Sequence, residues 1–443
     1  MYVTAIAAGA FRDKDIETLV LSRRLLKVED GAFLGCSRLE TVYYSDGIFI
    51  MEDEAFDEAT YTSFKNLYVN ATMAPRETGA ATAGLAVKLS RLLAGEGQKK
   101  IIVIGGSSAL QGLGSAYLES LLDMEYRVVN FGTTRTTNGM MYLEAMGDLA
   151  SEDDVIVYAP ENSAYMMGER ELYWKTIRDL EGMVNIWRHI DISNYTGVFS
   201  AITDFNRNHN RFTQNPSTYE AICRFAECGY GDAYTDRYGD YHQTSDSGKT
   251  SRATYVNDIY YTDSYYVTMN ERYKSRFDLN WNDKEGQAAN KDYSDPNNIT
   301  WCSITDPYYK DALNRAISAA KSSGAGVYFG FCPVDGDKLV EGADSLSWLL
   351  AYDEMIEKTY LFDGLIGSSV DYVFNHQYFF DCAFHLNDYG RTYRTYRLYL
   401  DLCETIGIEA KHGVADLGRD FTGCLFENTS DGAPIYPWEP TAP

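Results

Sequence analysis

The sequence has little positive charge for its length, and it has no long apolar run. Its 443 residues include 39 lysines and arginines against 64 aspartates and glutamates, a formal net charge of -25. Nucleic acids and anionic membrane surfaces bind basic faces, so this balance argues against both as partners. No stretch of about 18 apolar residues occurs, so we expect no membrane span.

Patterns that bind metals and nucleotides are also missing. The eight cysteines form no CxxC pair and show no zinc spacing, so we expect no metal site. The glycine-rich turn at 105–114 has no Gly-Lys-Ser/Thr and no dinucleotide glycine spacing, which makes nucleotide binding the weaker interpretation of that turn. The chemistry that the sequence favours needs no cofactor.

Residues 1–75 contain an internal repeat. Three units, 22 to 25 residues apart, keep the same apolar offsets, with an alanine before each phenylalanine: Ile6 and Phe11, Val28 and Phe33, Met51 and Phe56. This spacing is typical of solenoids in which each unit buries its apolar face against its neighbours. The segment from Gly31 to Val42 resembles the BspA-type leucine-rich repeat of bacterial surface proteins.

From Lys99 onward, strand and helix patterns alternate. Near-continuous apolar runs predict strands at 101–105, 127–132, 155–159, 326–333 and 371–374, and helical patterns cover 116–123, 140–149, 169–185, 309–322, 346–359 and 388–406. Strands of this kind are covered on both faces. The pattern predicts an α/β fold with a doubly wound, mostly parallel five-stranded sheet.

Residues of about 195–300 interrupt this alternation with a segment rich in Tyr, Asn, Asp and Gly. We expect this insertion to form a lid or wall over the site. Its tyrosines suit stacking on sugars, and they equally suit packing within a loop-rich subdomain. The predicted organisation is repeats at 1–75, a linker or helix at 76–98, and the α/β domain with its insertion at 99–443.

A serine stands where the first strand of the α/β domain meets its glycine turn. Ser107 follows Gly105-Gly106, so we expect it to be exposed at the carboxyl end of a parallel sheet, where open α/β folds place their sites. Near the last helix, Asp381 and His385 supply an acid and an imidazole. A serine hydroxyl becomes a nucleophile when a base takes its proton and a third group orients that base.

Other interpretations of these residues stay open. Ser107 could serve as the N-cap of the next helix, a role that Ser108 could fill equally well. His385 could cap the last helix, and His376 is a competing candidate for the base.

Block by block, the chain resembles the SGNH, or GDSL-like, hydrolase family. The matching segments are Gly105-Gly106-Ser107-Ser108, Asn130-Phe131-Gly132 and the late segment with Asp381 and His385. The resemblance implies an SGNH-hydrolase or flavodoxin-like fold and a triad of Ser107, Asp381 and His385. It also implies an oxyanion hole formed by the amides of Ser107 and Gly132 and the side chain of Asn162.

The third block departs from the family pattern. The chain has Ala159-Pro160-Glu161-Asn162 where Gly-x-Asn-Asp is expected, which places a carboxylate at the register of the oxyanion-binding amide. Glu161 and Arg135 are candidates for substrate contacts. Arg135 suits a substrate carboxylate or phosphate, and a salt bridge within the protein is the alternative.

The sequence therefore predicts a serine esterase or acyl hydrolase acting on an acylated carbohydrate, with a protein or glycan as the ligand of the repeats. The alternative is a surface binding protein whose hydrolase-like domain is inactive, a view that Glu161 favours. Because residues 1–6 resemble the middle of a repeat unit, we expect the chain to begin downstream of a removed leader. We expect the protein to be secreted or at the bacterial cell surface.

Overall fold

A computed structural model provides the structure of this chain. It describes residues 3–22, 25–44, 50–52, 54–57, 59–60, 64–66, 88–95, 97–132, 139–160, 186–194, 232–235, 238–244, 307–335, 345–374, 378, 385–386 and 388–412. The helix expected at 169–185 lies outside these residues, as does most of the insertion expected at 195–300.

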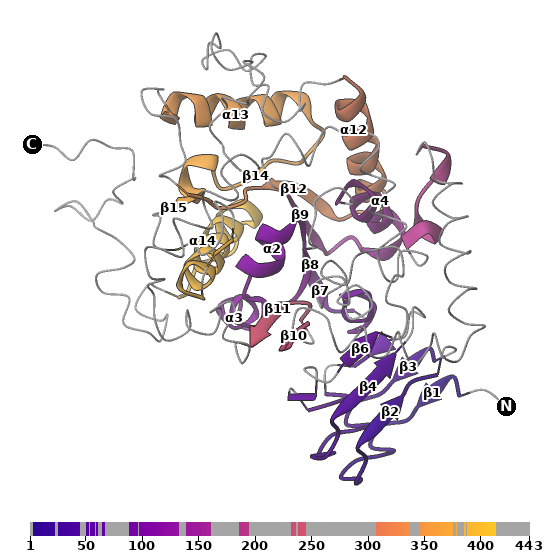
Figure 1. Ribbon diagram of the computed structural model, residues 1–443. Helices are drawn as coiled ribbons and strands as arrows, with labels where there is room; N and C mark the ends of the chain where they lie inside the picture. Colours follow the sequence, from indigo (N-terminus) through magenta and orange to yellow (C-terminus); the bar gives the residue numbers. More distant parts are fainter. Residues whose placement is uncertain are drawn as a thin grey trace, which may run out of the picture.

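A five-stranded parallel sheet forms the centre of the molecule (Figure 1). Its strands run in the order β14 (Leu365–Ile366), β12 (Gly326–Gly330), β9 (Val155–Ala159), β7 (Lys99–Gly105) and β8 (Tyr126–Gly132). All four neighbouring pairs are parallel. The order along the sheet is that of doubly wound folds with a crevice between the first and third strands. The prediction of an α/β fold with a five-stranded parallel sheet is confirmed.

Successive side chains of β7 point to opposite faces of the sheet, and both faces are buried. Ile102 and Ile104 pack in one apolar cluster with α4 (Gly139–Leu149), α12 (Pro307–Lys321) and α13 (Ser345–Thr359). Ile101 and Val103 pack in a second cluster with α2 (Ser107–Gly112), α3 (Ser115–Leu121) and α14 (Asp388–Ile406). Figure 1 shows these two groups of helices on opposite sides of the sheet.

The prediction of the fifth strand at 371–374 is wrong. The fifth strand of the sheet is β14, and the turn after it contains Gly367 in the left-handed region at φ +74°. A short 3-10 helix, Ser369–Tyr372, follows, and Val373–Phe374 (β15) pairs instead with β13 (Val334–Asp335) outside the main sheet. The two residues of β14 are too few to show a period in the sequence, whereas the longer segment 370–374, apolar except for Asp371, resembles a strand.

The N-terminal segment forms two short parallel sheets. One contains β1 (Ala5–Ile6), β3 (Lys27–Val28) and β5 (Ile50–Met51), and the other contains β2 (Thr18–Val20), β4 (Thr41–Tyr44) and β6 (Phe64–Asn66). The rings of Phe11, Phe33 and Phe56 stack with centroids 5.1 and 4.8 Å apart. Equivalent residues of successive repeats therefore pack on one another. The backbone amide of Met51 donates to Ser90 in the helical segment 88–93, which connects the repeats to the sheet domain.

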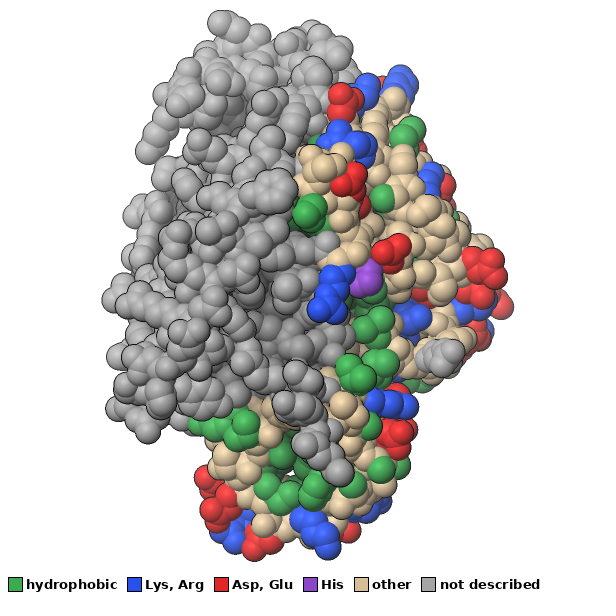
Figure 2. All heavy atoms as spheres, turned by 90° about the vertical axis from the view of Figure 1, so that its right-hand side faces the viewer, with side chains coloured by type: hydrophobic (Ala, Val, Ile, Leu, Met, Phe, Trp, Pro, Cys, Tyr) green, Lys and Arg blue, Asp and Glu red, His purple; other side chains and the backbone are tan. Residues whose placement is uncertain are grey.

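On the face that Figure 2 shows, the lysine and arginine side chains of the described surface lie among acidic ones rather than in one basic patch. Within the described ranges, no helix has the length and apolar character needed to cross a membrane.

A buried carboxyl on α13, that of Asp353, makes the stability of the folded protein depend on pH. Asp353 is 8% exposed, and it accepts hydrogen bonds from the hydroxyl of Ser368 at 2.6 Å and from the amide of Ser369. Burial raises its pKa to about 6, and the hydrogen bonds from Ser368 and Ser369 offset that effect only in part. The folded protein then holds a proton at pH 5 that the unfolded chain releases, so stability falls as pH rises from about 4 to 6.

We expect Asp353→Asn to flatten this pH dependence, because asparagine stays neutral. The wild-type protein should lose about 2–3 kcal/mol more than the variant between pH 4 and 7, from the 1.4 kcal/mol that each pKa unit represents. Urea unfolding midpoints across this range measure the difference. Parallel curves for the two proteins would contradict the assignment.

Candidate functional site

Ser107 begins α2 directly after the end of β7. The N-cap of α2 is Gly106, which has no side chain, so the interpretation of Ser107 or Ser108 as the cap is wrong. Strand β7 lies between β8 and β9, so the chain order reverses at its end. That point is where parallel sheets open a crevice for ligands. The Ser107 side chain therefore lies at the switch point of the sheet. The residue is only 6% exposed and His385 contacts its hydroxyl, so the expectation of an exposed serine is wrong.

His385 reaches the same point from the other end of the chain. It precedes α14 by three residues, and its Nε2 lies 2.8 Å from Oγ of Ser107. When the proton of the neutral imidazole is on Nδ1, Nε2 accepts a hydrogen bond from the serine hydroxyl. A base in this position can take the serine proton as Oγ attacks an acyl carbon. The structure thus brings together two of the three predicted triad residues.

Hydrogen bonds between α14 and α2 fix this geometry. The guanidinium of Arg394, which is 1% exposed, donates to the carbonyl of Ser108 at 3.1 Å. Nε of Arg391 donates to the carbonyl of Leu113 at 2.8 Å, and the amide of Gly114 donates to Oγ1 of Thr395 at 2.9 Å. These side chains lie on one face of α14, three and four residues apart. The helix that follows the histidine is therefore attached to the helix that begins with the serine.

Gly132 ends β8 beside the serine helix. Its backbone amide donates to Oδ1 of Asn130 at 2.8 Å, while Nδ2 of Asn130 donates to the carbonyl of Ala109 at 3.1 Å. The Gly132 amide that the family resemblance assigns to the oxyanion hole is thus engaged within the protein. It can bind an oxyanion only by sharing or releasing that hydrogen bond.

Packing gives a separate reason for glycine at position 132. A Cβ atom placed there would lie 2.2 Å from the amide nitrogen of Leu110 and 2.7 Å from its Cα. Both atoms belong to the backbone of α2, so a side chain at 132 would push the serine helix away from β8. Gly105 is similarly restricted, since its Cβ would lie 2.5 Å from the carbonyl oxygen of Ala159.

We expect Gly132→Ala to destabilise the folded protein by about 3 kcal/mol, at the upper end of typical overpacking costs. The matched control is Gly364→Ala, because a Cβ at 364 meets only Tyr328 at an ordinary 3.9 Å. Urea unfolding of both variants measures the difference. Equal stability of the two would show that α2 adjusts freely and that the close approach has no cost.

The other predicted site residues, Asp381, Arg135, Glu161 and Asn162, lie outside the described residues, as does the competing base His376. Their roles stay predictions.

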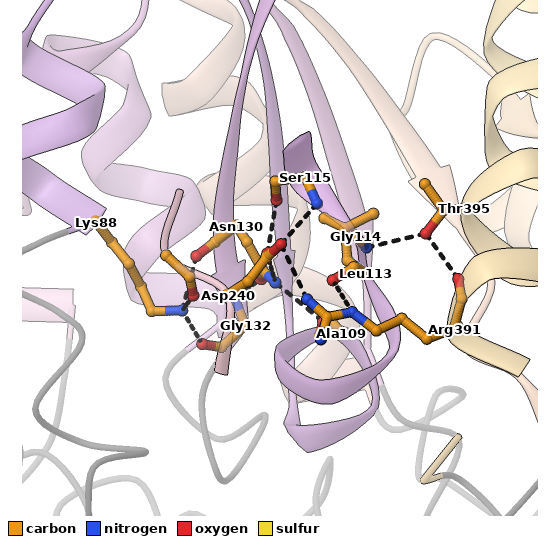
Figure 3. Close-up of polar contacts among 11 residues, drawn as sticks. Lys88, Ala109, Leu113, Gly114, Ser115, Asn130, Gly132, Asp240, Arg391 and Thr395 are labelled. Carbon is orange, nitrogen blue, oxygen red and sulfur yellow. Dashed lines mark hydrogen bonds and ion pairs between the residues drawn. The ribbon is translucent and has the colours of Figure 1, made fainter. Parts of the chain in front are cut away.

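Two buried charged residues next to the site, Asp240 and Lys88, are not predicted by the sequence (Figure 3). Asp240, in the turn before β11 (Tyr241–Thr244), accepts hydrogen bonds from Ser115, Asn130 and Arg391. Burial alone would raise the pKa of Asp240, but the positive charge of Arg391 and these hydrogen bonds outweigh it and hold the pKa below its usual value. Asp240 is therefore an ionised carboxylate inside the protein.

Lys88 is the second missed charge, and it is 1% exposed. Its Nζ donates to the carbonyl oxygens of Asn130, Gly132 and Gly239 at 2.7, 2.8 and 2.7 Å. The ammonium group thus holds the end of β8 against the turn that carries Asp240. These three partners of Lys88 are backbone atoms, which carry no residue signature, so no sequence pattern marks these hydrogen bonds.

Within the part of the chain that the structure describes, His, Cys, Asp and Glu side chains form no group of three or more that could hold a metal ion. Cys36, Cys332 and Cys403 are buried.

No protein-family model matches this chain, and no curated protein matches it. The class of this protein is therefore given by its fold and site geometry. It is an α/β protein with a serine–histidine pair at the switch point of its parallel sheet.

Proposed function

We propose that this protein is a serine esterase or acyl hydrolase of the SGNH type. The observation that carries the proposal is the 2.8 Å contact between Oγ of Ser107 and Nε2 of His385, two residues 278 positions apart in the sequence. In the proposed reaction, Oγ attacks the ester carbonyl while Nε2 takes the hydroxyl proton and passes it to the leaving alcohol. Water, activated by the same imidazole, then releases the acid and restores the serine.

The proposed substrate is an acylated carbohydrate at the bacterial cell surface. The tyrosine-rich composition of residues 195–300 supports a sugar ligand, because tyrosine rings stack on sugars and their hydroxyls form hydrogen bonds. The described part of this insertion includes Asp240, which is anchored to Asn130 and Ser115 next to α2. The insertion therefore approaches the serine helix. A secreted or surface location, and a protein or glycan ligand for the repeats, follow from the resemblance to bacterial surface repeats.

A second candidate function is binding without catalysis. The observation that favours it is the hydrogen bond from the Gly132 amide to Asn130, which occupies a donor that an oxyanion would use. Glu161, at the register of the third oxyanion donor, favours the same view.

A fluorophosphonate probe distinguishes the two candidates. A nucleophilic serine attacks phosphorus and displaces fluoride, which leaves a stable adduct on Oγ. We expect mass spectrometry of the digested protein to place this adduct on Ser107, and we expect His385→Gln to prevent it. An unlabelled wild-type protein would contradict the proposed hydrolase and support the binding protein.

A further inference from the structure

Asp240 has the full set of hydrogen bonds that a carboxylate can accept, and it is 2% exposed. Its Oδ1 accepts from Oγ of Ser115 at 2.6 Å and from Nδ2 of Asn130 at 2.9 Å. Its Oδ2 accepts from the amide of Ser115 at 2.6 Å and from Nη2 of Arg391 at 3.1 Å. Figure 3 shows the carboxylate between the α2–α3 segment, the end of β8 and the start of α14.

The hydrogen bonds from Ser115 and Asn130 connect Asp240 to the helix that begins with Ser107. Ser115 begins α3 just after the turn that follows α2, so Asp240 holds the far end of the serine helix. Asn130, oriented by its bond to Asp240, donates to the carbonyl of Ala109 in the first turn of that helix.

The hydrogen bond from Arg391 connects Asp240 to the helix that follows His385. Arg391 lies six residues after His385, in the first turns of α14, and its Nε also donates to the carbonyl of Leu113 at the end of α2. One guanidinium group therefore bridges the serine helix and Asp240. The segment that carries Asp240 belongs to the insertion, which contributes neither the serine nor the histidine.

We propose that Asp240 is a positioning residue that holds the serine helix and the histidine helix in register, so that Ser107 and His385 stay within hydrogen-bond distance. This inference rests on the proposed function and assigns the insertion a role in the catalytic geometry. An isosteric asparagine cannot replace the carboxylate. Its NH₂ group would face either the Asn130 amide or the donors of Ser115 and Arg391, so at least one connection is lost and Arg391 keeps an unbalanced charge.

The matched control is Asp401, a second buried carboxylate that pairs with an arginine of α14. It is 1% exposed and accepts hydrogen bonds from Arg397 and from the hydroxyl of Tyr372. Asp401 connects the later part of α14 to the 3-10 helix at 369–372, away from the serine helix. Asp401→Asn thus removes a comparable buried charge without touching the proposed connection.

The first readout is turnover of a short-chain aryl ester well below the unfolding temperature of each variant. We expect Asp240→Asn to lower kcat about 10- to 100-fold with little change in KM, the size of effect that a small misplacement of reacting groups produces. Asp401→Asn should keep wild-type kcat. Arg391→Lys, which keeps the charge but cannot reach both Leu113 and Asp240, is the second variant if Asp240→Asn does not fold. A wild-type kcat in the variant that folds would overturn the inference.

The second readout does not depend on activity. The ring ¹⁵N shifts of His385, assigned with His385→Gln, report its contact with Ser107. We expect Ser107→Ala to change these shifts clearly in the wild-type and Asp401→Asn backgrounds, and much less in the Asp240→Asn or Arg391→Lys background. An equal change in all backgrounds would overturn the positioning role. A wild-type protein that shows the shift change but neither hydrolyses esters nor reacts with the phosphonate would disprove the proposed hydrolase alone.

Discussion

Ser107→Ala should lower kcat/KM for a short-chain aryl ester by about three or more powers of ten, because the variant has no hydroxyl to form the acyl intermediate. The mutation removes the oxygen atom that contacts His385, and it leaves the hydrogen bond from Arg394 to the Ser108 carbonyl in place. We therefore expect the folded structure and the unfolding midpoint to change little. Initial rates with the purified protein, compared at equal concentration, measure the loss.

Ser120→Ala provides the control, since Ser120 is exposed on the neighbouring helix α3 and its hydroxyl donates only locally, to the carbonyl of Tyr117. It should keep full activity, whereas His385→Gln should lose nearly as much as Ser107→Ala. Equal rates in Ser107→Ala and the wild type would mean that a contaminating esterase produces the signal. No hydrolysis by any of the proteins would favour the binding protein.

The positions of the serine and the histidine were readable from the sequence because each stands next to a strong local signal. An apolar strand leads directly into Gly105-Gly106-Ser107, and a long helical pattern follows His385. The carboxyl ends of parallel strands meet at one edge of the sheet, which places Ser107 there. His385 does not directly follow a strand of this sheet, and hydrogen bonds between α14 and the serine helix bring it to the same edge. Apolar runs of the same kind predicted the first four strands of the sheet.

The contacts that hold the site residues in place could not be predicted from the sequence in this way. Asp240 lies in an insertion without a helix or strand period, and its partners belong to α3, β8 and α14. Lys88 donates to three backbone carbonyls at the end of β8 and in the turn before β11. The sequence shows a glycine at 132, but the close approach of Leu110 that requires glycine depends on how α2 packs. Contacts of this kind exist only in the folded chain.

A buried ion pair next to these residues gives the largest expected effect on stability. Arg91 and Glu119 have side chains that are 2% and 5% exposed, and they form a salt bridge. Oε1 of Glu119 also accepts from the amide of Val128 at 2.7 Å, and Nε of Arg91 donates to the Val128 carbonyl at 2.7 Å. The guanidinium also lies 4.4 Å from the ring centroid of Tyr238. The pair thus joins the helical segment 88–93, α3 and the edge strand β8.

We expect Glu119→Ala to cost about 3–5 kcal/mol of unfolding free energy, because it leaves a buried guanidinium without its counter-charge and an amide without its acceptor. The control Glu354→Ala breaks the pair with Lys358, whose side chains are 55% and 71% exposed, and should cost less than about 1 kcal/mol. Urea unfolding of both variants measures the contrast, and equal losses would refute it. The double variant Arg91→Met/Glu119→Leu removes both charges and should recover the part of the loss that comes from the unpaired guanidinium, while the Val128 amide stays without its acceptor.

The segment that carries Arg91 also holds Lys88 against the end of β8 and Ser90 against the repeat strand β5. Loss of the ion pair should therefore weaken three contacts at once: those of Arg91 with β8, of Lys88 with the end of β8, and of Ser90 with β5. We expect hydrogen exchange in Glu119→Ala to accelerate first at the amides of β8, including that of Gly132, while the amides of β12 on the other side of β7 and β9 stay protected. Uniform acceleration across the sheet would mean that the pair stabilises the domain as a whole. A local effect would show that the helical segment 88–93 is the element through which the repeats and the edge of the candidate site support each other.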